Sequence, residues 1–170
     1  QVLNTLHALL DHGIQVKINA VATQEHTLDD LLQLAELTRE QPVDVRFIEE
    51  MPFNGGDHHS ARPHWDHLRL VAAFSERWPG LQALPTLPAA TATAYQIPGH
   101  RGQLGVIAAW SRTFCGTCNR IRVTPQGVLK TCLYDHGVLN LRDLMRAGLS
   151  DADLTELLLR AFSNRHRDGW

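Results

Sequence analysis

The chain has 170 residues, a formal net charge of −2, 44% hydrophobic residues and 20% charged residues, which is the composition of an ordinary globular protein. Basic residues do not outnumber acidic ones, so the net charge does not indicate nucleic-acid binding. No apolar run approaches the roughly 20 residues that a membrane helix needs. No basic-then-apolar signal segment opens the sequence, so we expect a cytoplasmic protein whose three cysteines are more typical of metal binding than of disulfides.

Helix and strand patterns alternate in the first half of the sequence. The predicted elements are a helix that ends at Gly13, a strand over 14–22, a helix over 28–40, a strand over 43–49 and a helix over 65–78. Thr27 and Asp30 form a capping box for the second of these helices. This rhythm is typical of parallel α/β architecture, but two strands cannot form a parallel sheet covered on both faces. We therefore expect the C-terminal part of an incomplete, TIM-like α/β barrel, with further βα units upstream.

The pattern changes after a proline-rich segment over 79–88, which predicts a boundary between a barrel part (1–80) and a C-terminal domain (81–170). A turn sequence over 124–127 predicts a hairpin between two of the strands that follow. We expect a small α+β domain with strands over 92–97, 103–109, 119–123 and 128–133 and helices over 141–147 and 151–162, the helices capped by Asn140 and Ser150.

The three cysteines follow the spacing Cys115-x2-Cys118-x13-Cys132. A Cys-x2-Cys turn lets two thiolates point at one metal, and the third cysteine returns on the second arm of the hairpin. Two interpretations are open on spacing alone. His136 could complete a structural zinc site, or a four-iron cluster could use the three cysteines and keep one iron open.

Cations near these cysteines favour the cluster. Arg120 and Arg122 follow Cys118 at alternate positions of a predicted strand, so they would share one face. Two guanidinium groups beside a metal site are costly unless an anion lies there, and a structural zinc site has no need of them. Lys17 and Arg46 likewise stand on predicted strands of the α/β part, where a buried cation needs a charged partner. An anionic ligand would provide the charged partner that these four cations need.

Histidines are frequent near the glycine-rich loop, at His58, His59, His64 and His67. Such a cluster could bind a metal, but no carboxylate or cysteine completes a ligand set at regular spacing. We interpret these histidines as part of a solvated loop.

With these residues identified, the sequence resembles the GTP 3′,8-cyclase family, the radical S-adenosylmethionine enzymes that begin molybdenum cofactor biosynthesis. The resemblance covers nearly the whole chain, and its most specific part is Phe114-Cys115-Gly116-Thr117-Cys118-Asn119-Arg120-Ile121-Arg122-Val123. The other matching stretches are 16–21, 44–52, 102–105, 129–133 and 139–143.

The resemblance implies an incomplete barrel followed by a domain with an auxiliary [4Fe-4S] cluster, whose open iron meets the guanine base of GTP. It implies that GTP is converted to (8S)-3′,8-cyclo-7,8-dihydroguanosine 5′-triphosphate by a 5′-deoxyadenosyl radical, which takes hydrogen from the ribose before the sugar carbon attacks purine C8. The residues it assigns are Cys115, Cys118 and Cys132 to the cluster, Lys17, Arg46, Arg120, Ile121 and Arg122 to GTP, and Met51 to S-adenosylmethionine.

The sequence departs from this family in lacking the N-terminal Cys-x3-Cys-x2-Cys motif, which holds the cluster that cleaves S-adenosylmethionine, and the C-terminal Gly-Gly tail. We therefore expect the substrate half of the enzyme, inactive alone, whose partners are GTP, the N-terminal half of the same enzyme and a second copy in a homodimer. A zinc-stapled binding module without enzymatic activity and an iron–sulfur nucleotide sensor are the alternatives.

Overall fold

The computed structural model describes residues 1–51, 62–111 and 113–166, and the chain folds as two compact units, Gln1–Thr113 and Phe114–Trp170. The units meet in sequence at Thr113, about thirty residues beyond the boundary predicted from the proline-rich segment 79–88. The strands that follow this segment join the same sheet as the strands that precede it, which explains why it does not separate the two units.

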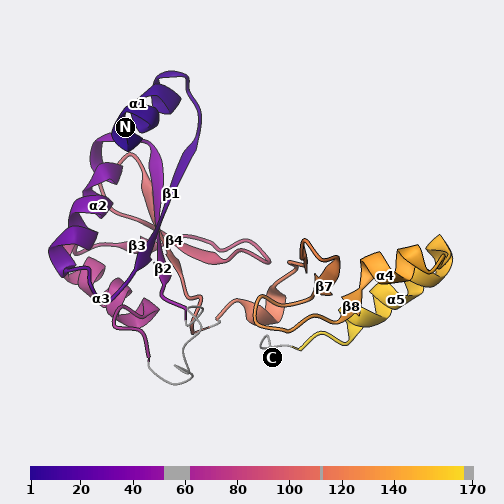
Figure 1. The fold of residues 1–170 in the computed structure, drawn as a ribbon. Helices are drawn as coiled ribbons and strands as arrows, with labels where there is room; N and C mark the ends of the chain where they lie inside the picture. The colour runs from indigo at the N-terminus through magenta and orange to yellow at the C-terminus, as the bar shows by residue number, and fades with distance from the viewer. Residues whose placement is uncertain (52–61, 112, 167–170) are drawn as a thin grey trace. The chain divides into compact units, whose positions relative to one another are not determined.

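The first unit is built on a mixed five-stranded sheet of order β1-β2-β5-β4-β3 (Figure 1). β1 pairs with β2 and β2 with β5 in parallel, while β5–β4 and β4–β3 are antiparallel. The elements are α1 (Val2–Asp11), β1 (Val16–Ala22), α2 (Leu28–Glu40), β2 (Val43–Glu49), α3 (His67–Arg77), β3 (Gln82–Ala83), β4 (Ala92–Gln96) and β5 (Gln103–Ile107). All the predicted elements of this region are present, and the short β3 was not predicted.

Helices of the first unit lie on one face of its sheet (Figure 1). Val43, Val45 and Phe47 of β2 are fully buried on this face, and the ring of Phe47 lies 4.9 Å from that of Phe74 in α3. The capping box that begins α2 is formed as predicted, because Thr27 accepts a hydrogen bond from Asp30 N and Asp30 accepts one from Thr27 N.

The opposite face of the sheet carries the polar residues of β1 and β2. Lys17 and Asn19 are exposed, and Asp44 and Arg46 are half-buried. The period of two pairs Lys17 with Asn19 and Asp44 with Arg46, and the parallel register places both pairs on the same face. Within this unit no helix of the described residues covers that face in the way that a strand buried on both sides requires.

The second unit has a small antiparallel sheet of order β6-β7-β8 and two helices. The predicted hairpin is present, with Gly127 in its turn at φ 82°, a conformation that favours glycine. Asn140 and Ser150 cap the two helices as predicted, each accepting a hydrogen bond from the backbone three residues on. The elements are η1 (Cys115–Thr117), β6 (Arg122–Val123), β7 (Val128–Lys130), β8 (Leu139–Asn140), α4 (Leu141–Arg146) and α5 (Asp151–Ser163).

The observed class is thus mixed α/β, with a mixed sheet in one unit and a small antiparallel sheet in the other. Among the described residues, no helix has the length and apolar character needed to cross a membrane.

Candidate functional site

Arg46 lies in β2, on the open face of the first sheet. Its guanidinium Nη2 is 3.4 Å from Asp44 Oδ2, and both side chains are about three-quarters buried, with exposed fractions of 26% and 22%. Gly105 is its partner on β5, and a Cβ added there would lie only 2.9 Å from Arg46 Cγ, so glycine makes room for the arginine. A cavity of about 170 Å³ opens beside these residues, lined also by Thr86 and Gln103.

Lys17 stands next to this ion pair across the β1–β2 ladder, where it is the register partner of Asp44. The Lys17 side chain is exposed, so it can reach an anion in solution without the cost of burying an unpaired charge. Met51 is half-buried, two residues beyond the end of β2. The structure thus brings Lys17 and Arg46 to one face of the sheet.

Cys115 and Cys118 lie at the start and just past the end of the 3-10 turn η1, and Cys118 N donates to Cys115 O over 3.2 Å. Arg120 Nη1 donates to Cys118 Sγ over 3.3 Å. A guanidinium group this close favours the thiolate over the neutral thiol. Arg165, which the sequence analysis did not select, donates to Cys118 O from the segment after α5.

The pKa of the Cys118 thiol is lowered below its ordinary value of 9.0. Partial burial works in the opposite direction, but it is outweighed by a hydrogen bond from the Arg120 backbone and by the charges of Arg165 and Arg120. The thiolate is the form that binds metals, so this environment suits a metal ligand. Nothing in the local sequence marks Arg165, because it lies 47 residues away.

Cys132 lies in a loop organised by Asp135. Asp135 Oδ2 accepts hydrogen bonds from Thr131 N and Cys132 N, each at 2.7 Å, and Oδ1 accepts one from Gly137 N at 2.9 Å. The amide of Tyr134 donates to Cys132 Sγ over 3.4 Å. The loop therefore has a defined conformation around the cysteine. Asp135 was also missed by the sequence analysis, although an aspartate two residues before a glycine is a recognisable turn signal, because its side chain can accept from the backbone N–H two residues on, as it does here from Gly137 N.

The chemistry of the three half-buried cysteines fits an iron–sulfur cluster, since N–H groups point at two of the sulfur atoms and cations stabilise one thiolate. Within the described residues, however, no three His, Cys, Asp or Glu side chains are gathered closely enough to hold a metal ion. His136, the fourth ligand of the zinc interpretation, is exposed. Ligation by Cys115, Cys118 and Cys132 stays a prediction.

The two arginines after the cysteine turn differ in their surroundings. A strand over 119–123 was predicted, but β6 contains only Arg122 and Val123, so Arg120 precedes it. Arg120 is half-buried against Cys118, whereas Arg122 and Ile121 are exposed. The arginines therefore do not form one regular strand face, because the chain after Cys118 becomes a strand only at Arg122.

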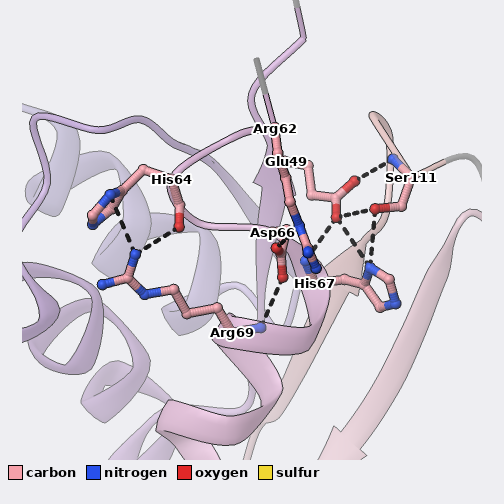
Figure 2. A network of polar contacts seen from close by, with 7 residues as sticks. All are labelled: Glu49, Arg62, His64, Asp66, His67, Arg69 and Ser111. Atoms are coloured by element: carbon pink, nitrogen blue, oxygen red, sulfur yellow. Dashed lines mark hydrogen bonds and ion pairs between the residues drawn. The ribbon is translucent and has the colours of Figure 1, made fainter. Parts of the chain in front are cut away.

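The structure also contains a buried carboxylate that the sequence analysis missed. Glu49, the last residue of β2, is fully buried and contacts His67 and Ser111 (Figure 2). The signal was present in the alternation of β2, because Glu49 falls on the same face as the buried Val43, Val45 and Phe47.

The assignment of the histidines to a solvated loop was wrong for His67. This residue is the first of α3, and its ring contacts buried Glu49. His64 precedes the helix and accepts a hydrogen bond from Arg69 at its backbone oxygen (Figure 2). His58 and His59 lie outside the described residues.

Comparison with known proteins identifies the class to which this chain belongs. The family profile described as Molybdenum Cofactor Synthesis C matches residues 43–169, three-quarters of the chain. The chain therefore belongs to this family, as its cysteine and arginine motif indicated.

Individual relatives are similar over almost the whole chain. Molybdenum cofactor biosynthesis protein 1 of Mus musculus is 38% identical over 174 residues, which cover 98% of this chain and 26% of the relative. The corresponding protein of Drosophila melanogaster is 39% identical over 158 residues, or 91% of this chain and 27% of the relative. GTP 3′,8-cyclase of Clostridium perfringens strain 13 is 36% identical over 162 residues, or 95% of this chain and 49% of the relative. The chain thus spans between a quarter and a half of the length of these relatives.

Proposed function

We propose that this chain is the substrate-binding part of a GTP 3′,8-cyclase in molybdenum cofactor biosynthesis. The complete enzyme would convert GTP to (8S)-3′,8-cyclo-7,8-dihydroguanosine 5′-triphosphate. The proposal is supported by the family to which the chain belongs and by the similarity to a bacterial relative named GTP 3′,8-cyclase. The observation that carries it is the contact between the Arg120 guanidinium and Cys118 Sγ, because a cation beside a metal-binding thiolate suits an anionic substrate there.

Cys115, Cys118 and Cys132 would hold a [4Fe-4S] cluster, since they are the three cysteines of the chain and share one compact unit. When bound, a cluster with three cysteine ligands supplies an open iron that can accept a ligand atom of the substrate. The contribution of the protein is to keep the thiolates deprotonated. Arg120 and Arg165 do so at Cys118, and the loop held by Asp135 orients Cys132.

GTP would be bound by Lys17, Arg46, Arg120, Ile121 and Arg122. The four of these residues that are cations would contact the triphosphate. Guanidinium groups suit this task because two of their N–H groups can donate in parallel to phosphate oxygens. Arg46 is partly neutralised by Asp44, so we expect it to contribute through directed hydrogen bonds more than through net charge.

Met51 would contact S-adenosylmethionine in the complete enzyme. The remaining parts of this proposal are a partial TIM-like barrel completed by an N-terminal half, a cytoplasmic location and a homodimeric assembly. The parallel pairing of β1, β2 and β5 is compatible with such a barrel.

Anaerobic reconstitution of the chain with iron and sulfide, followed by titration with GTP, tests the proposal. We expect about four irons per chain, as a four-iron cluster requires, and GTP binding that depends on the iron. One tightly bound zinc and no affinity for GTP would instead favour a zinc-stapled binding module.

A further inference from the structure

Arg165 brings a second guanidinium group to Cys118, in addition to that of Arg120. It is the second residue after α5, and its Nη1 donates a hydrogen bond to Cys118 O. Arg120 Nη1 donates to the sulfur of the same cysteine over 3.3 Å. The guanidinium group of arginine stays charged in proteins, so two permanent cations contact one proposed metal ligand.

Another N–H donor of Arg165 has no acceptor within the protein. Its Nε atom is buried, and the part of the chain that the structure describes offers it no hydrogen-bond partner. Buried N–H groups are nearly always paired, because an unpaired group loses its hydration and gains nothing in return. A buried charged donor next to Cys118 therefore indicates an acceptor that is not one of the described residues.

The segment around Arg165 also borders Cys132. A cavity of about 340 Å³ is lined by Cys132 and by Asn164 and His166, the residues on either side of Arg165. The segment 164–166 thus contacts Cys118 through Arg165 and reaches the cavity at Cys132 through the two neighbours. It is therefore close to two of the three cysteines that are proposed to bind the cluster.

A sulfur atom of the cluster is the acceptor that best fits this position. The thiolates and sulfides of an iron–sulfur cluster accept hydrogen bonds from N–H groups, and these bonds help to set its reduction potential. A phosphate oxygen is the other common anionic partner of a guanidinium group. The hydrogen bond to Cys118 O favours the sulfur, because it holds Arg165 beside a cluster ligand whether or not a nucleotide is bound.

We propose that Arg165 belongs to the iron–sulfur site: it holds Cys118 through the backbone oxygen and supplies, from Nε, an N–H donor to a sulfur atom of the cluster. This inference rests on the proposed function, in which the three cysteines bind a [4Fe-4S] cluster. Reduction adds an electron, so a cation and an N–H donor stabilise the reduced cluster more than the oxidised one. Arg165 therefore raises the reduction potential and helps to retain the iron.

The test compares Arg165→Ala and Arg165→Lys with the native 170-residue chain, each reconstituted anaerobically with iron and sulfide. Arg165→Ala should lower the reduction potential, measured by titration with dithionite and visible absorption. It should also lose iron to a chelator about tenfold or more faster, as is typical when an outer-shell partner of a metal site is removed. Arg165→Lys keeps the charge without the guanidinium fork, so its potential should lie between the two.

Arg146→Ala is the matched control, because it removes an exposed arginine of α4 from the same unit. Its reduction potential and its rate of iron loss should equal those of the native chain. Circular dichroism checks that each variant is folded. If Arg165→Ala retains too little iron for a titration, the potential of Arg165→Lys decides.

The reduction potential separates this inference from a structural role. A native potential in the iron-containing variants would overturn the inference, even if iron were lost faster or GTP bound more weakly. Arg165 would then support the fold or a phosphate rather than a cluster sulfur. A native chain that takes up no iron would contradict the proposed function, whereas unchanged variants of an iron-containing chain would contradict only this inference.

Discussion

Arg120 donates a hydrogen bond from its guanidinium Nη1 to the sulfur of Cys118 over 3.3 Å, while Arg122, two residues on, is exposed to solvent. A guanidinium group has five N–H donors, so Arg120 can contact a thiolate and still bind a phosphate oxygen. The two arginines therefore have different expected roles, which substitution can separate.

Alanine substitution of either arginine should weaken GTP binding to the reconstituted chain. Each charge-assisted contact contributes roughly 1.5–3 kcal/mol, so we expect a loss of about 10- to 150-fold for each, measured by isothermal titration. Of these two substitutions, only Arg120→Ala should also reduce iron retention, because Arg120 contacts the sulfur of Cys118. Guanosine should bind weakly and be nearly indifferent to both changes.

Arg146→Ala is the matched control for this pair, because Arg146 is an exposed arginine of α4 in the same unit. It should change neither GTP affinity nor iron content. Equal losses for GTP and guanosine in the arginine variants would mean that the arginines support the cluster or the fold rather than the phosphates.

Serine substitution of Cys115, Cys118 or Cys132 should abolish the brown colour and bound iron of the reconstituted chain, since a three-cysteine cluster has no spare ligand. His136→Ala should leave both intact, as expected for an exposed side chain outside the ligand set. Iron and sulfide analysis with visible absorption measures the outcome. Loss of the metal in the His136 variant would point to a four-ligand site.

The 170-residue chain should not cleave S-adenosylmethionine. It contains three cysteines, all of them assigned to the proposed auxiliary cluster, and no Cys-x3-Cys-x2-Cys motif. Incubation with GTP, S-adenosylmethionine and a strong reductant should give no 5′-deoxyadenosine by liquid chromatography. Turnover by the highly purified chain would contradict the proposal that it is the substrate-binding part.

Asp135→Asn should destabilise the loop of Cys132. The amide NH2 would replace an oxygen that accepts from Thr131 N or Cys132 N, and leaving a buried donor without a partner costs about 1–3 kcal/mol. Faster alkylation of Cys132 and a lower free energy of unfolding are the expected results. Asp11→Asn, at the exposed C-terminal end of α1, is the control for the loss of an aspartate charge.

Because of the Asp135 carboxylate, we also expect the free energy of unfolding to decrease at acidic pH. Partial burial raises the pKa of Asp135, but hydrogen bonds from Cys132, Thr131 and Gly137 outweigh it and hold the pKa below its ordinary value of 3.8. The stabilisation is therefore present above pH 3.8 and is lost as the pH falls through the lower pKa of the folded state. Urea unfolding in this range should show a smaller acid loss for Asp135→Asn than for the native chain.

Because of His100, we expect the free energy of unfolding to depend on pH in a second range, which lies at higher pH than that of Asp135. Burial, assisted by the charge of Arg39, lowers the pKa of this histidine below its ordinary value of 6.5, and its Nδ1 lies 2.8 Å from Thr38 Oγ1. The folded state favours the neutral ring, so its stabilisation is present above pH 6.5 and decreases as the pH falls toward the lower folded-state pKa. His100→Gln should reduce this decrease in urea unfolding, whereas the same change at exposed His7 should not.

Local features of this protein followed directly from its sequence. The capping box of Thr27 and Asp30 involves residues three apart, so neighbours in the chain suffice to form it. The alternation along β2 placed Asp44 and Arg46 on one face for the same reason, and the cysteine and arginine motif indicated the family. These features depend on the spacing of residues along the chain, which can be read directly from the sequence.

Contacts between segments that are far apart in the sequence became known only from the folded structure. Glu49 and Ser111 lie 62 residues apart, and their contact exists because β5 pairs with β2 and carries the following segment to the end of that strand. Arg165 likewise reaches Cys118 across 47 residues. No local pattern encodes such contacts, because they depend on the order of strands in the sheet and on the path of the chain between them. The buried partner of a charge such as Glu49 is therefore known only once the chain has folded around it.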